Sequence, residues 1–132
     1  MIVSRVVLAA SGLMFLGFGL AFMFRPVATA GMVGISLPEP AAVTEIRAFY
    51  GGLEVGLAAL LFVAAAYGPW RAMGLALATA AFAGPALGRI VGLVLDGKPR
   101  SVIYTILAVE LAGAAVAAVC LVLETRTAAD GG

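Results

Sequence analysis

Four long runs of apolar residues take up most of the chain and limit its fold more than any other feature. They lie at about residues 6–24, 48–67, 72–95 and 102–123. A helix needs about 20 mostly apolar residues to cross the hydrocarbon core of a bilayer. The runs are long enough for this and lack the alternation of apolar and polar residues found in membrane strands. They therefore predict four transmembrane helices.

The composition supports a membrane protein. Of the 132 residues, 64% are hydrophobic and only 11% are charged, and the mean hydropathy is +1.15. Soluble domains are about one quarter charged. The net charge of +1 comes from dispersed residues, which leaves no basic patch for nucleic acid. We expect a single transmembrane domain whose main partner is the lipid bilayer.

The connections predict how the helices are arranged. Very short turns near residues 68–71 and 96–100 force the helices that they join to run antiparallel. The longer connection after the first helix begins at Pro26, which suits the first turn of a short interfacial helix. The predicted fold is all-α, an antiparallel four-helix bundle with this interfacial segment. Its helices lie at about residues 6–24, 45–67, 71–95 and 101–123, followed by a frayed tail at 124–132.

Four spans place both termini on the same side of the membrane. We call this side A; it also holds the second connection. The first and third connections lie on side B. Basic residues are divided almost evenly between the two sides, so the positive-inside rule favours neither orientation.

Three charged residues interrupt the predicted spans. Glu54, Arg89 and Glu110 lie in the second, third and fourth helices. At 1.5 Å per residue, each is about 9 to 14 Å inward from the side B end of its helix. A charge at membrane depth is costly and marks a candidate functional site. Their similar depth predicts that the three side chains meet in a buried polar pocket.

Two further residues join this candidate site. Arg47, Tyr50, Gly51 and Glu54 have the spacing of one stripe on an α-helix, leading from the side B rim to the buried carboxylate. We therefore include Arg47 and Tyr50 among the candidate ligand- or proton-binding residues. Two carboxylates facing one guanidinium leave a negative charge, unless Arg47 reaches inward or one glutamate stays protonated.

Glycines in the second and third helices predict close helix packing. Small residues let helix backbones approach one another in lipid. The expected packing positions are Gly51, Gly52, Gly56, Gly84, Gly88 and Gly92. They could serve the bundle itself, a second copy of the chain or a partner membrane protein.

The residues needed for common enzyme chemistry are missing. The chain has no His and one Cys, Cys120, which removes the usual zinc, copper and haem ligands and any Ser-His-Asp or Cys-His site. Cys120 is expected to be a small apolar residue in the core or facing lipid. We predict no catalytic residue, no metal and no cofactor, and therefore not an enzyme.

Residues 45–54 follow the pattern Glu-x-Arg-Ala-x-Tyr-Gly-Gly-Leu-Glu. This segment resembles the signature of an uncharacterised family of small bacterial four-helix membrane proteins, a domain of unknown function. Arg25-Pro26, Gly88-Arg89, the Asp-Gly-Lys-Pro run at 96–99 and Glu110 extend the resemblance. It implies a multi-pass protein of the bacterial inner membrane and implies no activity. In size and plan the chain is also similar to DoxX-like membrane proteins.

These observations lead to three hypotheses about function. The first is a polar pocket of Glu54, Arg89, Glu110, Tyr50 and Arg47 that binds a small amphipathic molecule, a lipid or a proton. The second is a structural or accessory subunit in which the same charges only lock the bundle, because buried charges in membranes commonly pair with one another. The third is a proton-coupled transporter of small molecules.

Overall fold

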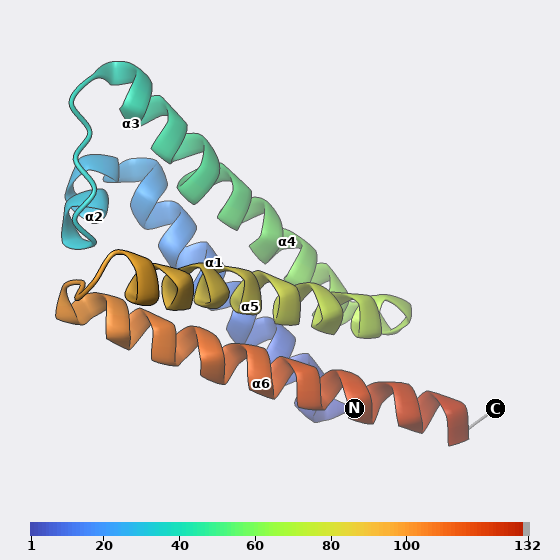
Figure 1. The fold of residues 1–132 in the computed structure, drawn as a ribbon. Helices are drawn as coiled ribbons and strands as arrows, with labels where there is room; N and C mark the ends of the chain where they lie inside the picture. The colour runs from blue at the N-terminus through green and yellow to red at the C-terminus, as the bar shows by residue number, and fades with distance from the viewer. Residues whose placement is uncertain (131–132) are drawn as a thin grey trace.

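The computed structural model describes residues 1–130, which are mainly helical and contain no strand (Figure 1). The predicted all-α four-helix architecture is confirmed. The elements are α1 (Ile2–Phe24), α2 (Pro26–Met32), α3 (Pro40–Ile46), the π-helix η1 (Arg47–Gly52), α4 (Leu53–Ala66), the 3₁₀ turn η2 (Gly68–Trp70), α5 (Arg71–Leu95) and α6 (Ser101–Asp130). The elements α3, η1 and α4 follow one another without a break.

Four helical stretches are long and apolar enough to cross a membrane. They are Ile2–Phe24, Pro40–Ala66, Gly68–Leu95 and Ser101–Thr127. The second begins at Pro40, before the predicted start at residue 45, because proline is well suited to the first position of a helix. The chain is thus a multi-pass membrane protein by the length and composition of its helices.

The last helix is longer than expected. We predicted a frayed tail from residue 124, but α6 continues to Asp130, and only Gly131 and Gly132 lie outside the described residues. Neither glycine nor proline interrupts this stretch. The hydroxyls of Thr125 and Thr127 donate to carbonyls one turn earlier, Leu121 O at 3.0 Å and Leu123 O at 2.9 Å. The helix therefore has no residue that would end it before Asp130.

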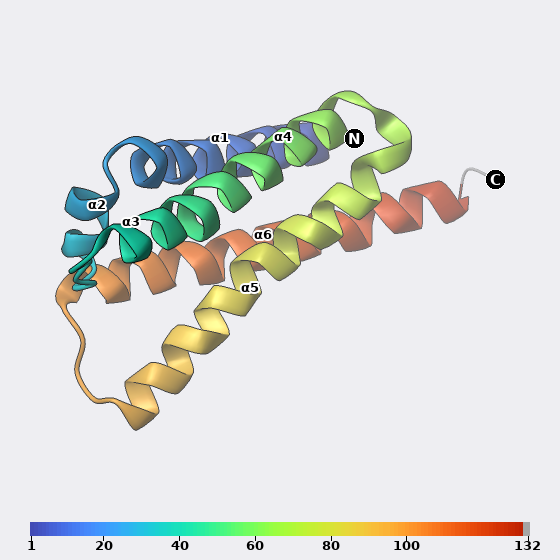
Figure 2. The same cartoon turned by 90° about the horizontal axis from the view of Figure 1, so that it is seen from above.

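The short helix predicted after α1 is present as α2, with Pro26 in its first turn. It ends where Ile35 N–H donates to Ala30 O at 2.9 Å. Gly34 makes this turn with φ of +85°, a conformation that favours glycine. The segment between α2 and α3 then returns along the side B end of the bundle (Figure 2).

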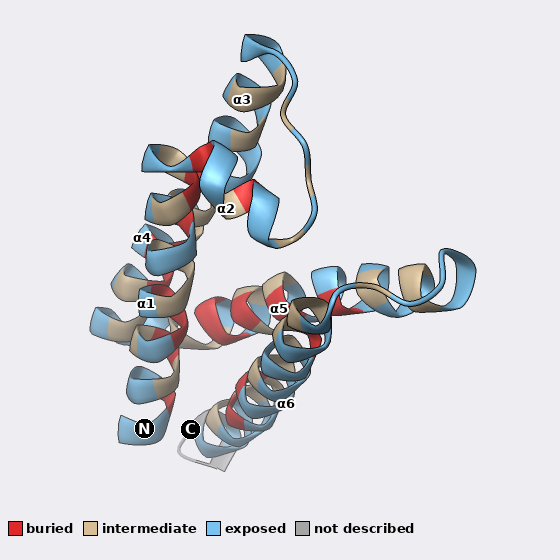
Figure 3. Ribbon diagram, turned by 90° about the vertical axis from the view of Figure 1, so that its left-hand side faces the viewer, coloured by how far each residue is buried: buried red, intermediate tan, exposed pale blue. Residues whose placement is uncertain are grey.

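The bundle consists of two helix pairs. α1 packs mainly against α4, and α5 packs mainly against α6, while α1 also contacts α5 and α6. The apolar core lies in the half of the bundle nearest to η2, the side A end. Its members are Leu8, Leu61, Ala64, Leu75, Ala78, Ala117 and Cys120. Buried residues follow the faces that the helices turn toward one another (Figure 3).

Several glycines that we did not single out make the closest helix contacts. A Cβ atom at Gly74 of α5 would lie 2.4 Å from the Cβ atom of Ala64 on α4. At Gly12 and Gly113 it would meet the rings of Phe62 and Phe82 at 2.9 and 3.0 Å. These positions need glycine because a neighbouring helix or ring occupies the space of a side chain.

The predicted glycine ridge of α5 packs differently. Within residues 1–130, no atom of another element lies within 4 Å of a Cβ built at Gly84 or Gly88, and at Gly92 the nearest atom is 3.5 Å away on Asp96. Gly56 on α4 is equally open. The prediction that these glycines pack the bundle is therefore wrong for contacts within the described chain, because their faces point away from the other helices.

The glycine contacts predict opposite effects for two matched substitutions. Gly74→Ala should lower the free energy of unfolding by about 1 to 3 kcal/mol, because the new methyl group overlaps Ala64. Gly88→Ala should be neutral or stabilising by up to about 1 kcal/mol, because alanine favours the helix and the space is open. Unfolding in mixed micelles by added dodecyl sulfate, followed by circular dichroism, measures both. Equal stability of the two variants would contradict the packing described here.

Candidate functional site

The segment at residues 45–54 contains a π-helix. Leu53 N–H donates to Ala48 O, five residues earlier, where an α-helix would use the residue four earlier. A π-helical turn contains one residue more than an α-helical turn. The side chains that follow it are therefore rotated about the helix axis by about 100° relative to those that precede it. Short π-helical turns occur frequently at functional sites. The spacing of an ordinary α-helix therefore does not apply across η1.

The residues within η1 face α1. Arg47 Nη1 donates to the carbonyl of Met23 near the end of α1. The ring of Tyr50 packs on Phe22, with centroids 5.1 Å apart. A Cβ atom at Gly51 would lie 3.1 Å from the backbone nitrogen of Met23. This segment thus fixes the end of α1.

The predicted stripe from Arg47 to Glu54 is therefore wrong. Arg47 and Tyr50 are exposed residues that contact α1, whereas the Oε2 atom of Glu54 is buried. The extra residue of the π-turn accounts for the separation. Arg47 also does not reach inward to balance the second carboxylate. Its guanidinium binds the carbonyl of Met23 instead.

Gly51 fulfils its predicted packing role. At Gly19 of α1, a Cβ atom would lie 3.0 Å from the carbonyl oxygen of Gly51 and 2.9 Å from the side chain of Val55. The two backbones touch directly, which requires glycine on both helices. Gly52 makes only ordinary contacts, at 3.8 and 3.9 Å.

Two of the three intramembrane charges form an ion pair. Arg89 Nη1 donates to Glu110 Oε1 and forms an ion pair that links α5 to α6. The pair is largely buried, with 26% of the Arg89 side chain and 13% of the Glu110 side chain exposed. The guanidinium of Arg89 thus pairs with Glu110 and not with Glu54.

Glu54 is left without an ion-pair partner among residues 1–130. Its Oε2 atom is buried and accepts no hydrogen bond, and the same is true of Glu110 Oε2. Together with Arg89, these residues carry one positive and two negative charges, so the group has an excess of one negative charge when both carboxylates are ionised. In a low-dielectric interior, a buried acceptor without a donor is costly. We call Glu54, Arg89 and Glu110 the polar centre.

Two surface grooves in the described part of the chain lie elsewhere. One, of about 620 Å³, is lined by α1 and α2, and the other by α1 and the end of α4. Neither includes a member of the polar centre. The polar pocket expected from the sequence is thus not one of these grooves.

A second polar cluster, which we did not predict, ties three helices together at the side A end. Ser4 Oγ of α1 donates to Glu124 Oε2 at 2.5 Å, and Arg71 Nη1 of α5 donates to Glu124 Oε1 at 3.0 Å. The N-terminal amine also lies 3.3 Å from Glu124. The sequence offered two signals for this cluster. They are the carboxylate of Glu124 at the end of the last apolar run and Arg71 at the start of the third.

Residues 1–130 hold no group of three or more His, Cys, Asp or Glu side chains placed to share a metal ion. The polar centre has two carboxylates, but an arginine pairs with one of them. The carboxylates of the polar centre can accept a proton or a hydrogen bond from a donor.

The comparison with protein families agrees with this architecture. A family model described as a domain of unknown function, DUF4345, matches residues 3–121. The chain belongs to this family. DUF4345 assigns no activity, and its match spans all four long helices and the polar centre. No curated protein and no solved structure matches the chain.

The ion pair predicts a non-additive response to mutation. Arg89→Met should lower the free energy of unfolding by up to about 3 kcal/mol, because it leaves two buried carboxylates without a counter-charge. Adding Glu110→Leu should recover at least half of this loss, since an apolar pair of similar volume removes one uncompensated charge. Unfolding by dodecyl sulfate measures the free energy of unfolding of the single variant, the double variant and the wild type.

Arg5→Met provides the control for loss of a positive charge. Arg5 is exposed and forms no ion pair within the described chain, so its replacement should change stability by less than about 0.5 kcal/mol. If the double variant were less stable than Arg89→Met alone, the ion pair would not be the reason for the loss.

Proposed function

We propose that this DUF4345 member is a non-enzymatic multi-pass protein of the bacterial inner membrane that binds a small amphipathic molecule or a proton at its polar centre. Both termini would lie on the same side of the membrane. The observation that carries the proposal is the pair of buried carboxylate oxygens, on Glu54 and Glu110, that lack a hydrogen-bond donor. No nucleic acid, cofactor or metal takes part.

Charge balance supports a ligand that brings a positive charge or a donor. Glu110 already engages Arg89, so Glu54 carries the excess negative charge. A net charge within the hydrocarbon region is expensive. A proton on Glu54, or the cationic or hydrogen-bond-donating end of an amphipathic molecule, would remove that cost. Glu54 would be the exchangeable group, and Arg89 would hold Glu110 in place.

The location of the polar centre supports access from lipid. The apolar core lies toward the side A end, whereas many apolar residues in the second half of α5 are exposed, including Leu87, Val91 and Val94. A molecule dissolved in the bilayer could therefore approach Arg89 and its neighbours along α5. An amphipathic ligand suits this route because its polar end would meet the carboxylates and its apolar part would stay in lipid.

A structural or accessory role is the second candidate, and the Arg89–Glu110 pair favours it. This pair joins two helices inside the bundle, and the open glycines of α5 leave a surface on which a partner helix could pack. In that case Glu54 would have no ligand. Replacing Glu54 by leucine would then stabilise the protein and leave every binding measurement unchanged.

The proposal predicts that binding of a lipophilic cation releases a proton from Glu54. With protein reconstituted in lipid nanodiscs, tetraphenylphosphonium should bind more tightly as pH rises, because it competes with protons for one carboxylate. Glu54→Gln should reduce the affinity at least tenfold, because it removes the charge of that carboxylate while keeping its shape. Isothermal titration calorimetry in buffers of different ionisation enthalpy measures binding and proton release together.

Glu45→Gln is the matched control, since Glu45 is an exposed carboxylate in α3 with no ion pair in residues 1–130. It should bind the cation as the wild type does. Circular dichroism must show that both variants remain folded. Equal binding by Glu54→Gln and the wild type would refute the proposed role of Glu54 and leave the structural role.

A further inference from the structure

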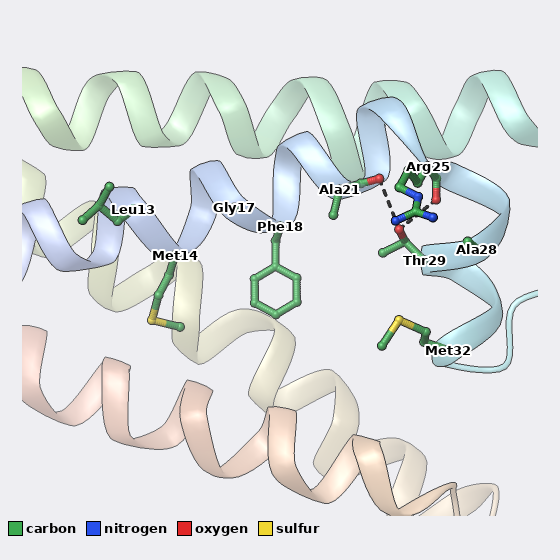
Figure 4. Close-up of a pocket in the computed structure, with 9 residues that line it drawn as sticks. All are labelled: Leu13, Met14, Gly17, Phe18, Ala21, Arg25, Ala28, Thr29 and Met32. Atoms are coloured by element: carbon green, nitrogen blue, oxygen red, sulfur yellow. Dashed lines mark hydrogen bonds between the residues drawn. The ribbon is translucent and has the colours of Figure 1, made fainter.

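The groove on α1 and α2 is a second candidate site, separate from the polar centre. It has a volume of about 620 Å³. Its apolar wall includes Leu13, Met14 and Phe18 of α1 and Met32 of α2, and Arg25 lies where α1 turns into α2 (Figure 4). Leu13 and Phe18 are 63% and 46% exposed. The groove is thus an open apolar channel with a cationic end.

Its length fits one leaflet of a bilayer. Leu13 is at the middle of α1, and Arg25 follows the end of the helix. The distance between them along the helix is about 18 Å, at 1.5 Å per residue. Half of the hydrocarbon core is about 15 Å thick. An acyl chain of a side B lipid would therefore lie along the groove with its headgroup at Arg25.

Arg25 is the only charged residue among those that line the groove. Thr29 Oγ1 donates to Ala21 O at 3.2 Å and to Arg25 O at 2.8 Å (Figure 4). These bonds satisfy two carbonyls at the end of α1. The Arg25 guanidinium pairs with no acidic side chain in the described chain, and the residue is exposed. It is therefore available to an anion in the headgroup region.

A second arginine adds positive charge beside the same short helix. Arg100 Nη1 donates to Gly31 O of α2 at 2.9 Å, next to Met32 of the groove wall. Like Arg25, it forms no ion pair with an acidic residue among residues 1–130. The two guanidinium groups lie toward opposite ends of α2. Such local positive charge attracts anionic headgroups.

We propose that this groove binds an anionic glycerophospholipid of the side B leaflet, with one acyl chain along α1 and the phosphate at Arg25. The positive charge of Arg25 and Arg100 favours an anionic lipid over a zwitterionic one. The apolar wall of the groove and its length, which matches one leaflet, favour a lipid over a soluble anion. A guanidinium can hold a phosphate with two parallel hydrogen bonds. The proposal does not depend on the function of the polar centre.

Gly17 offers a way to fill the groove without disturbing the bundle. It lines the groove, and no atom of another element lies within 4 Å of a Cβ built there. Gly17→Leu should therefore block the acyl chain while the helix contacts remain. Gly56→Leu is its control, because Gly56 is equally open but lies on α4, outside the groove.

The experiment is native mass spectrometry of detergent-purified protein with added phosphatidylglycerol or phosphatidylcholine of the same acyl chains. The wild type should bind phosphatidylglycerol about five- to tenfold more tightly than phosphatidylcholine. Arg25→Gln should remove most of this preference, with Arg100 accounting for the rest, and Arg25→Lys should keep most of it. Gly17→Leu should weaken binding of both lipids, whereas Gly56→Leu should bind as the wild type does.

Three results would overturn the proposal. They are equal binding of the two lipids by the wild type, an unchanged lipid preference in Arg25→Gln, and unchanged lipid binding by Gly17→Leu. Glycerol 3-phosphate provides a further check. If it displaced phosphatidylglycerol at concentrations equal to those of the lipid, the phosphate alone would be recognised and the groove would have no part in binding.

Discussion

The interaction on which the polar centre depends is the ion pair between Arg89 and Glu110. In hydrocarbon no water is present to solvate either charge, so each must find its partner within the protein. The pair links α5 to α6 and leaves Glu54 of α4 as a third charged residue without a partner in the described chain. A structural lock alone would need one acid for one base. The second carboxylate makes the centre a candidate for exchange with a proton or ligand.

The π-helix η1 separates two tasks that its sequence places side by side. Arg47, Tyr50 and Gly51 hold the end of α1, and Glu54, one turn later, belongs to the polar centre. With regular α-helical spacing, Arg47 would lie on the same face as Glu54 and could neutralise it. The extra residue directs Arg47 to the Met23 carbonyl instead. The segment at residues 45–54 thus combines an anchor for α1 with an unneutralised carboxylate.

The sequence predicted the four helices and the similar depth of Arg89 and Glu110 because both follow from hydropathy and helical rise. It did not predict the π-turn, because no residue pattern distinguishes six π-helical residues from an α-helix. It also assigned close packing to Gly84 and Gly88 from their spacing alone, whereas Gly74 and Gly113 make the contacts. Spacing identifies a small-residue ridge, but the rotation of the helix decides whether another helix faces it. The tie of Ser4 and Arg71 to Glu124 required knowledge of which helix ends meet.

The two ends of the bundle differ in how they are held, and this bears on where ligands can bind. At the side A end, the core around Leu8 and Leu75 is fully buried, and Glu124 joins α1, α5 and α6. Toward side B, the contacts are backbone contacts of α1 with η1, the Arg89–Glu110 pair and the bonds of arginines to carbonyls. Close packing at one end fixes the helices, so the other can hold the polar centre and the groove on α1 and α2 without loss of the fold. Both candidate sites lie in this second half of the bundle. Substitutions at Arg25, Gly17 or Glu54 should therefore change binding far more than they change stability.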